Sequence, residues 1–599
     1  AVLVSASLSA QTMKVKCTVK DNLGPLPGAS VAVKGTTIGT VANLDGVAEL
    51  DNVKPDDIIV VSFIGYGTVE TPVAGKSQLE IVLVDDSIAL QETVVVGYGT
   101  QKKANLTGSV DQVTSEVFEG RSNANVAQML QGQVPGLNLT FTDGRPNSSP
   151  SFNIRGKTSV GAGGSALVLI DGVEGDSSLL NPDDIESVSI LKDAASAAVY
   201  GARAPYGVVI ITTKTAKKGR AKVSYSANIS FQTPTSIPDV VTDGYTYASM
   251  FYDAWYNYKL SNPSNINKTQ QFSLAWLQEY KRHKDAGYYE TVVSDGTIGS
   301  AGRWVYYHKG TNYYDALYKD FTLTQTHNIS VSGGDDKFEY YFSGRLYDNN
   351  GLFDTTINPE KYRMYNGRMK LSYQIVPWLK LSNNTSISYT NYVFPVTYGE
   401  GNGNVWRTIA DEGHPSSPLF NPDGTMTYSA VYSIGDQLYG KSRRIYENNQ
   451  TQTTFTALAN FFDNRLRINA DFTYNSRHNA TNTRMVRTPY SKTLGVIETI
   501  DGTQSYMSET FYDYTYITTN EFVEYEQTFA GKHYFKALVG FNYEQESYKR
   551  TYARANDLID SSVENIQLAE GVTIEDGSIV SGEKTNRRKL DKMAQCRRV

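Results

Sequence analysis

The strongest constraint on this chain is a two-residue alternation of apolar and small polar side chains that recurs through its second half. Successive side chains of a β-strand point to opposite faces, so residues 222–231 form one apolar and one polar face. The apolar face carries Val223, Tyr225, Ala227, Ile229 and Phe231, and the polar face carries Ser224, Ser226, Asn228 and Ser230. The pattern returns at 338–346, 369–373, 379–389, 455–461, 466–474 and 535–543. It predicts antiparallel strands with one apolar face, as in a soluble sandwich or a membrane barrel.

The connections distinguish between these two architectures. Tight turns are predicted at 333–336, 376–377, 463–464 and 531–532, and long segments lie near 234–320, 391–450, 477–510 and 547–585. The short and long connections therefore alternate along the chain. A barrel with short turns at one rim and long loops at the other requires this alternation, and a sandwich does not. The many aromatic residues of the long segments suit stacking on sugar rings, but an interfacial girdle or loop packing explains any single one of them better.

Composition agrees with a barrel and argues against several other classes. The chain has 42 Tyr and 22 Phe at a mean hydropathy of −0.38, and no apolar run reaches the roughly 18 residues of a transmembrane helix. A net charge of −6 does not fit a general nucleic-acid binder. Cys17 and Cys596 cannot form a disulfide framework or a cysteine-based zinc site, and the histidines lack metal-ligand spacing. We therefore expect no cofactor and no enzymatic activity.

The first 105 residues divide into three parts. Residues 1–10 end in small side chains ahead of polar sequence, which predicts the remnant of a signal peptide. Residues 13–85 contain short β-type runs between turn residues and predict a small β-sandwich. Residues 86–105 form a linker in which three consecutive valines, 94–96, favour extended backbone. Such a segment can add as a strand to a partner's sheet, or it can be the last strand of the preceding module.

Residues 106–215 predict a mixed α/β unit. A short helix is expected at 125–132, ending at Gly132, and an Ala-rich helix at 194–200. Strands are expected at 152–156, 166–172, 185–191 and 208–213, with a helical turn at Pro182.

The run from Asp184 to Lys214 resembles the plug signature of TonB-dependent outer-membrane transporters, and among these the SusC/RagA family. The Leu-Ile-Asp-Gly and Ile-Arg-Gly motifs match as well, as does the order of a carboxypeptidase-regulatory-like module, a Val-Val-Val-Gly-Tyr-Gly box and a plug. Residues 204–206 read Ala-Pro-Tyr where the family pattern has Ala-Ala-Asn.

This resemblance implies two sets of functional residues. Arg155 and Glu186 would make polar contacts between plug and barrel wall, although an ordinary surface salt bridge explains each equally well. The implied TonB box consists of Glu92, Thr93, Val94, Val95, Val96, Gly97, Tyr98 and Gly99.

The predicted fold is mainly β. It consists of a carboxypeptidase-regulatory-like β-sandwich at 13–85, an α/β plug at 106–215 and a partial antiparallel transmembrane β-barrel at 216–599. About nine or ten strands fit into this length, whereas a lumen that accepts such a plug needs about 22. The final residues also lack the aromatic terminus typical of these barrels. We therefore expect the barrel to be C-terminally incomplete, through truncation or a frameshift near residue 590.

The resemblance implies TonB-dependent import of a nutrient, most plausibly an oligosaccharide, across the outer membrane. The implied partners are TonB with its inner-membrane motor proteins, a SusD-like surface lipoprotein and outer-membrane lipid, with no nucleic acid. The plug and the N-terminal module would face the periplasm. The alternative is a cell-surface receptor or adhesin that binds a glycan or protein without transport. Such a receptor needs neither a plug nor a TonB box.

Overall fold

A computed structural model describes residues 12–587 and 591–598. Within these ranges the description leaves out residues 22–23, 37, 64–65, 67, 84–92, 97–98, 103–108, 119–124, 141–145, 147–149, 155–164, 217, 267–268, 398–404, 501–504, 530–532, 557, 559–561 and 563–577. The chain divides into two compact units, one of residues 1–110 with 191–202 and one of residues 111–190 with 203–599. Among the described residues, no helix is both long and apolar enough to cross a membrane.

The N-terminal module is a sandwich of two small sheets, with strand orders β4-β1-β7 and β3-β2-β5-β6. Alternate residues of its first strand, Val15, Cys17 and Val19, are fully buried in the core between the sheets. Gly46 forms the turn before β4 at a φ of 72°, and a Cβ there would lie 2.4 Å from the Val19 carbonyl oxygen, so glycine is required. The strands are β1 Met13–Lys20, β2 Ser30–Val33, β3 Gly39–Val41, β4 Val47–Val53, β5 Ile58–Ser62, β6 Val69–Pro72 and β7 Gln78–Val82.

A two-stranded hairpin follows the sandwich. It joins β8 (Thr93–Val96) to β9 (Gly99–Lys102), with Val95 opposite Thr100. The extended backbone that the consecutive valines favour is therefore present in β8.

The α/β unit is built on a five-stranded sheet of order β10-β15-β16-β13-β14. Strands β13 and β16 run parallel, with Ile170 opposite Ile211. The Asn125 side chain caps α1 by accepting from the Ala127 amide. The elements are β10 Val110–Thr114, η2 Ser115–Val117, α1 Val126–Leu130, β11 Leu137–Thr140, β12 Ser151–Ile154, β13 Leu167–Ile170, β14 Val173–Glu174, η3 Ser177–Leu179, η4 Pro182–Asp184, β15 Ile185–Leu191, α2 Ala194–Ala197, η5 Ala198–Arg203 and β16 Val208–Thr213.

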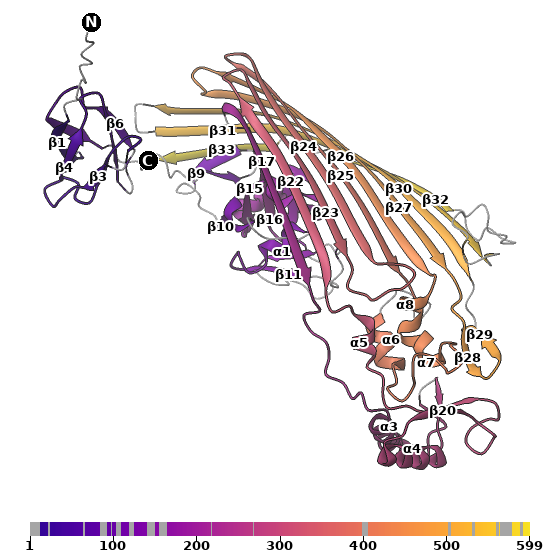
Figure 1. Ribbon diagram of the computed structural model, residues 1–599. Coiled ribbons are helices and arrows are strands. Elements are labelled where there is room, and N and C mark those ends of the chain that lie inside the picture. Colours follow the sequence, from indigo (N-terminus) through magenta and orange to yellow (C-terminus); the bar gives the residue numbers. More distant parts are fainter. Residues whose placement is uncertain are drawn as a thin grey trace, which may run out of the picture. The chain divides into compact units, whose positions relative to one another are not determined.

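The second half of the chain forms one large antiparallel sheet, called here the strand wall (Figure 1). Its strands are β17 Gly219–Gln232, β22 Thr322–Gly334, β23 Phe338–Asn350, β24 Lys361–Val376, β25 Leu379–Pro395, β26 Arg443–Phe461, β27 Leu466–Met485, β30 Tyr506–Phe529, β31 His533–Asn556, β32 Ser578–Arg587 and β33 Asp591–Arg598. The predicted alternation is present, because Val223, Ile229 and Phe231 of β17 are 60–72% exposed on one face. A mainly β fold with a partial barrel is confirmed.

The strands of the wall are longer than the alternation predicted. β26 begins at Arg443 rather than near 455, and β27 continues to Met485 rather than ending near 474. The added residues continue the same hydrogen-bonded ladder. Because most of them are Thr, Asn, Gln or Arg, they do not form an apolar face. The alternation therefore marked only the apolar part of each strand.

The described part of the wall does not close on itself. β17 pairs with β22 alone, and both β32 and β33 pair with β31, one after the other along the same edge. No ladder joins β17 to the described residues after 578. This agrees with the partial barrel expected from the number of strands.

The long connections of the wall fold into helices and small hairpins with their own aromatic cores. One core contains Trp276, Tyr280 and Tyr307, and another contains Tyr313, Leu317 and Ile434. The elements are α3 Gly244–Lys259, β18 Asn265–Ile266, β19 Gln270–Gln271, α4 Leu274–Ala286, β20 Glu290–Val293, β21 Trp304–Tyr307, α5 Tyr313–Leu317, α6 Val405–Glu412, α7 Tyr428–Ala430, η6 Val431–Gly435, α8 Asp436–Tyr439, β28 Tyr490–Thr493 and β29 Val496–Glu498.

We predict that Cys17 reacts with thiol reagents only when the sandwich unfolds. Burial raises the pKa of its thiol to about 11, so the thiolate fraction at pH 8 falls about a hundredfold, and the core also blocks access. In a Cys596→Ser protein, maleimide labelling at pH 8 should be slow in buffer and fast in denaturing urea. Rapid labelling in buffer would contradict the burial of Cys17.

Candidate functional site

The candidate site lies where the α/β unit meets the strand wall, and it starts from two neighbouring strand ends. Asp171 directly follows β13, and Thr213 is the last residue of the parallel strand β16. The carboxyl ends of parallel strands meet at one edge of a sheet, which brings these two side chains together. Thr213 donates to the Asp171 carboxylate from its amide at 2.9 Å and from its hydroxyl at 2.6 Å. Asp171 itself has a φ of 49°.

Strands β24 and β25 supply the opposite side of the site. Asn366, Arg368 and Lys370 alternate along β24 and therefore lie on one face of the wall. Asn384 of β25 is the direct partner of Lys370 in the ladder, so its side chain lies on the same face.

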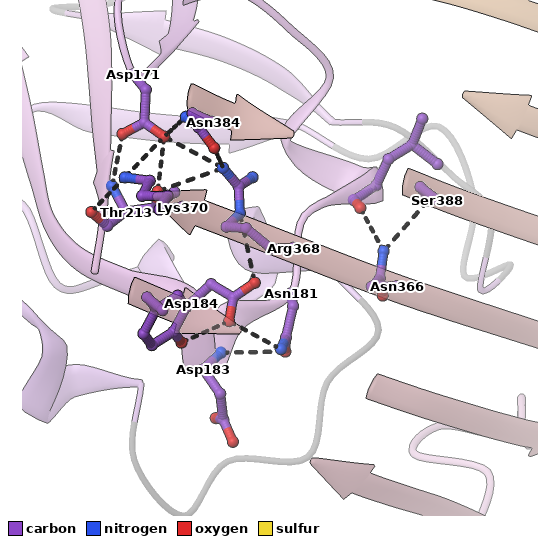
Figure 2. Close-up of polar contacts among 12 residues, drawn as sticks. Asp171, Asn181, Asp183, Asp184, Thr213, Asn366, Arg368, Lys370, Asn384 and Ser388 are labelled. Carbon is purple, nitrogen blue, oxygen red and sulfur yellow. Dashed lines mark hydrogen bonds and ion pairs between the residues drawn. The ribbon is translucent and has the colours of Figure 1, made fainter. Parts of the chain in front are cut away.

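One carboxylate oxygen of Asp171 collects the contacts across this interface (Figure 2). Its Oδ2 lies 3.2 Å from both Arg368 and Lys370, and it accepts a hydrogen bond from Asn384 at 2.8 Å. Lys370 also donates to the Thr213 carbonyl oxygen at 2.9 Å, and Arg368 donates to Asn384 Oδ1 at 3.0 Å. Two cations and an amide of the wall therefore converge on one loop of the α/β unit.

Asp184 provides the second acid. It ends the short helix η4, and its Oδ2 lies 3.5 Å from Arg368 Nε. Tyr341 of β23 donates to its Oδ1 at 2.9 Å. The side chains of Arg368 and Asp184 are only 6% and 3% exposed, so this ion pair is removed from water. We call Asp171, Asp184, Thr213, Arg368, Lys370 and Asn384 together the plug seat.

Charges in the plug seat balance. Two carboxylates face two cations, which is the condition under which buried charges are tolerated. Burial alone would raise the pKa of Asp171, but Lys370, Arg368 and the Thr213 hydrogen bonds outweigh it and lower that pKa to about 2. Asp171 is therefore an anion at neutral pH.

Further polar ties join the α/β unit to other strands of the wall. Arg203 pairs with Glu544 of β31 at 2.5 Å, Ser226 of β17 donates to Asp183 at 2.9 Å, and Asn366 donates to the Leu179 carbonyl oxygen at 2.7 Å. These contacts involve strands near both edges and the middle of the sheet.

Apolar packing is organised differently. The apolar core of the α/β unit includes Phe118, Met129, Ile185 and Val209, and all its buried members lie between positions 113 and 211. None of them comes from the strand wall. The α/β unit thus folds around its own core, and the hydrogen bonds and ion pairs described above join it to the wall.

A polar cavity of about 670 Å³ separates the two surfaces beside β17 and β22. Glu186 is exposed and lines this cavity, and no hydrogen bond or ion pair of its side chain occurs within the described part of the chain. Arg155, the other predicted contact, lies outside the described residues, as do Glu92, Gly97 and Tyr98 of the predicted TonB box. The role proposed for Glu186 and Arg155 stays a prediction, and the contacts that the structure does place between the two surfaces are those of the plug seat.

Sequence reasoning did not identify the plug seat. It noted Asp171 and Asp184 only as parts of a motif, and it did not single out Arg368, Lys370 or Asn384. One available signal was the position of Lys370 on the polar face of the predicted strand 369–373, where a cation must meet water or an acid; Arg368 lies just before that predicted strand.

Comparison with known families identifies the two N-terminal parts. Residues 102–208 match the TonB-dependent Receptor Plug Domain, and residues 15–96 match the CarboxypepD_reg-like domain. The chain is 34% identical over 367 residues to TonB-dependent receptor SusC of Bacteroides thetaiotaomicron, which covers 59% of this chain and 32% of that protein. It is 26% identical over 591 residues to TonB-dependent receptor P3 of Formosa agariphila, covering 97% of this chain and 53% of that protein.

The fold also has a counterpart among solved structures. The structure of the RagAB peptide importer in the "open-open" state superposes with a TM-score of 0.62 at 24% identity, over 83% of this chain and 53% of that one. The chain thus spans about half, or less, of the length of the proteins that it resembles.

The α/β unit is therefore a plug of the kind found in TonB-dependent receptors. The order of the domains and the similarity to SusC support a transporter of the SusC/RagA type. Receptors of this type are outer-membrane proteins, and these relatives are not enzymes.

We predict that Arg368→Gln weakens the attachment of the plug by about 3–5 kcal/mol, because it leaves two buried carboxylates with one cation. Limited proteolysis of the plug across a urea series, in detergent, measures the effect. Arg363→Gln is the matched control, since Arg363 lies on the same strand but is 46% exposed and pairs with Asp348. Equal urea midpoints for the two variants would contradict the plug seat.

The plug seat should also respond to acid. The pKa of Asp171 is lowered from 3.8 to about 2, so its stabilisation is complete above pH 3.8 and is lost as the pH falls through 2. The loss amounts to about 2 kcal/mol. In Arg368→Gln the pKa of Asp171 rises, so plug release, followed by the same proteolysis, should begin at a higher pH. A pH profile identical to that of the wild type would argue against the pairing.

Proposed function

We propose that this protein imports a nutrient across the outer membrane, with the plug as a movable barrier and TonB as the source of work. The observation that carries the proposal is the polar nature of the plug seat. A plug with its own apolar core keeps that core covered when it leaves the wall, and the plug-seat contacts that its departure breaks are ion pairs and hydrogen bonds. The same groups hold the plug firmly at rest, because unpaired buried charges are costly.

The proposed handle for TonB is the box at residues 92–99. Strand addition requires an extended backbone, and β8 has one. One edge of β8 is paired with β9, so TonB either adds at the other edge or displaces β9. A pull on β8 is then transmitted through the linker to the plug. This arrangement assigns the plug and the N-terminal module to the periplasmic side.

The nutrient and the outer partner follow from the relatives by analogy. The SusC/RagA resemblance of the sequence implies an oligosaccharide, whereas the RagAB protein is described as a peptide importer. We infer an oligosaccharide, handed over by a SusD-like lipoprotein that covers the long connections of the wall. The rival is a receptor that binds its ligand without importing it. The plug domain favours import, because binding alone needs no gate.

The box assignment predicts that Val95→Pro abolishes TonB binding and nutrient uptake. Proline removes a ladder donor from the strand that TonB would extend. Val95→Thr is the matched control, since it keeps both the backbone N–H and a β-branched side chain. Titration of peptides covering residues 90–101 against a TonB C-terminal domain, together with uptake by cells, gives the two measurements. Unchanged affinity for the proline peptide would contradict the assignment.

The partner assignment predicts that a SusD-like lipoprotein copurifies with the protein. A tagged protein is solubilised from native membranes in mild detergent, and its companions are identified by mass spectrometry. Consistent recovery of the receptor alone would favour the rival function. A tagged outer-membrane porin from the same membranes controls for nonspecific carry-over.

A further inference from the structure

The loops beyond the strand wall enclose a small cavity whose lining comes from four separate parts of the chain. Its volume is about 40 Å³. The lining includes Thr269, Gln270, Arg303, Trp304, Tyr428 and Lys492. These residues belong to or adjoin β19, β21, α7 and β28. Figure 1 shows α7, β28 and β20, the partner of β21, beyond the ends of the long strands.

The two cations of the cavity are held on paired segments. Arg303 bridges Thr493 through the backbone, and the Trp304 indole donates to the Ser491 hydroxyl at 3.2 Å. Lys492 lies 4.5 Å from the ring centre of Tyr428. The backbone pairing therefore fixes Arg303 and Lys492 beside the same opening.

Several polar groups of the cavity are donors without a partner among the described residues. The Gln270 side-chain oxygen already accepts from Ser416 at 2.6 Å and from Ser417 at 3.1 Å, and the Gln271 oxygen accepts from the Ser300 amide at 3.3 Å. Neither side-chain NH₂ group has a partner in the described part of the chain.

A hydroxyl and a guanidinium add to this set. The hydroxyl of Thr269 is buried, at 7% exposure of the residue, and makes no hydrogen bond with any described residue. Arg303 makes no side-chain hydrogen bond or ion pair with any described residue. Lys492 has Glu498 at 3.4 Å, but Glu498 does not line the cavity, and no other acid does. The cavity therefore offers the guanidinium of Arg303 and several donors that are unpaired among the described residues, and the Lys492 ammonium beside it shares its charge with Glu498 outside the lining.

We propose that this cavity binds the carboxylate of an acidic saccharide, a uronic acid residue of an oligosaccharide. The volume suits a group of about three heavy atoms, since one water needs roughly 10–15 Å³ by the same measure. Arg303 and Lys492 supply charge-assisted hydrogen bonds, and Thr269 and the glutamine amides complete the set of donors. The sugar ring remains at the mouth, beside the partly exposed Trp304 and Tyr428, whose faces suit its apolar side.

This inference rests on the proposed function for its biological role, because it names the class of nutrient. The binding step itself needs no TonB. A Val95→Pro protein should therefore still bind the acidic saccharide while failing to import it, which keeps the two proposals separable.

The test is calorimetric titration of the purified protein in detergent with uronate trisaccharides. Trigalacturonate, trimannuronate and a glucuronate-bearing trisaccharide are the probes, and the methyl ester of each is its neutral match. At least one acid should bind about tenfold or more tightly than its ester. Arg303→Gln and Lys492→Gln should each weaken binding of the acid about tenfold and leave the ester unchanged. Thr269→Val should weaken the acid to a smaller degree.

Arg282→Gln is the matched control, because Arg282 is 77% exposed on α4 in the same loop region and does not line the cavity. Its affinity for the acid should equal that of the wild type, and trypsin resistance of the loops checks that each variant is folded. Equal affinity for acid and ester, absence of binding by all three acids, or an unchanged affinity in Arg303→Gln would overturn the inference. Binding of an acidic tripeptide in place of the saccharides would overturn the assignment to sugar.

Discussion

Two carboxylates of the plug and two cations of the strand wall neutralise one another at a place that is largely closed to water. Asp171 and Asp184 approach from one side and Arg368 and Lys370 from the other, and each charge is tolerable only while the others are present. Removal of one partner leaves a buried charge, whereas removal of the whole plug returns every group to solvent. Because losing one partner is costly and releasing the whole plug is not, the same interface can be stable at rest and still dissociate reversibly.

The geometry of that interface follows from two simple periodicities. Parallel strands end at one edge of the plug sheet, which brings Asp171 beside Thr213, and the two-residue period of β24 places Arg368 and Lys370 on one face. The pairing of Lys370 with Asn384 then completes the set of donors. Because the apolar core of the plug is confined to its own residues, the wall needs to supply only polar groups.

Strands and turns whose formation depends on neighbouring residues were predicted well from the sequence. The alternation at 222–231, the tight turns at 333–336, 376–377 and 463–464 and the Ile185–Leu191 strand were predicted from neighbouring residues alone. The predicted turn at 531–532 lies outside the described residues. The polar ends of β26 and β27 were missed because both of their faces are hydrophilic, so no period is visible. The plug seat was missed for a different reason. Arg368 and Asp171 are 197 positions apart, and no local sequence pattern predicts which acid pairs with a cation on the inner face of the wall.

The cavity around Thr269 and Lys492 is likewise formed by loops that are distant in the sequence.

In the proposed mechanism the plug must leave the wall for the nutrient to pass. Asp183 and Ser226 lie on opposite sides of the interface, with a hydrogen bond of 2.9 Å between their side chains, and neither belongs to the plug seat. Replacing both with Cys, in a protein whose own cysteines are replaced, permits a short reducible bis-thiol linker to join plug and wall. Uptake by cells with and without the linker is the direct measurement. The linked protein should bind its nutrient but import none, and reduction should restore import. Full import by the linked protein would contradict it.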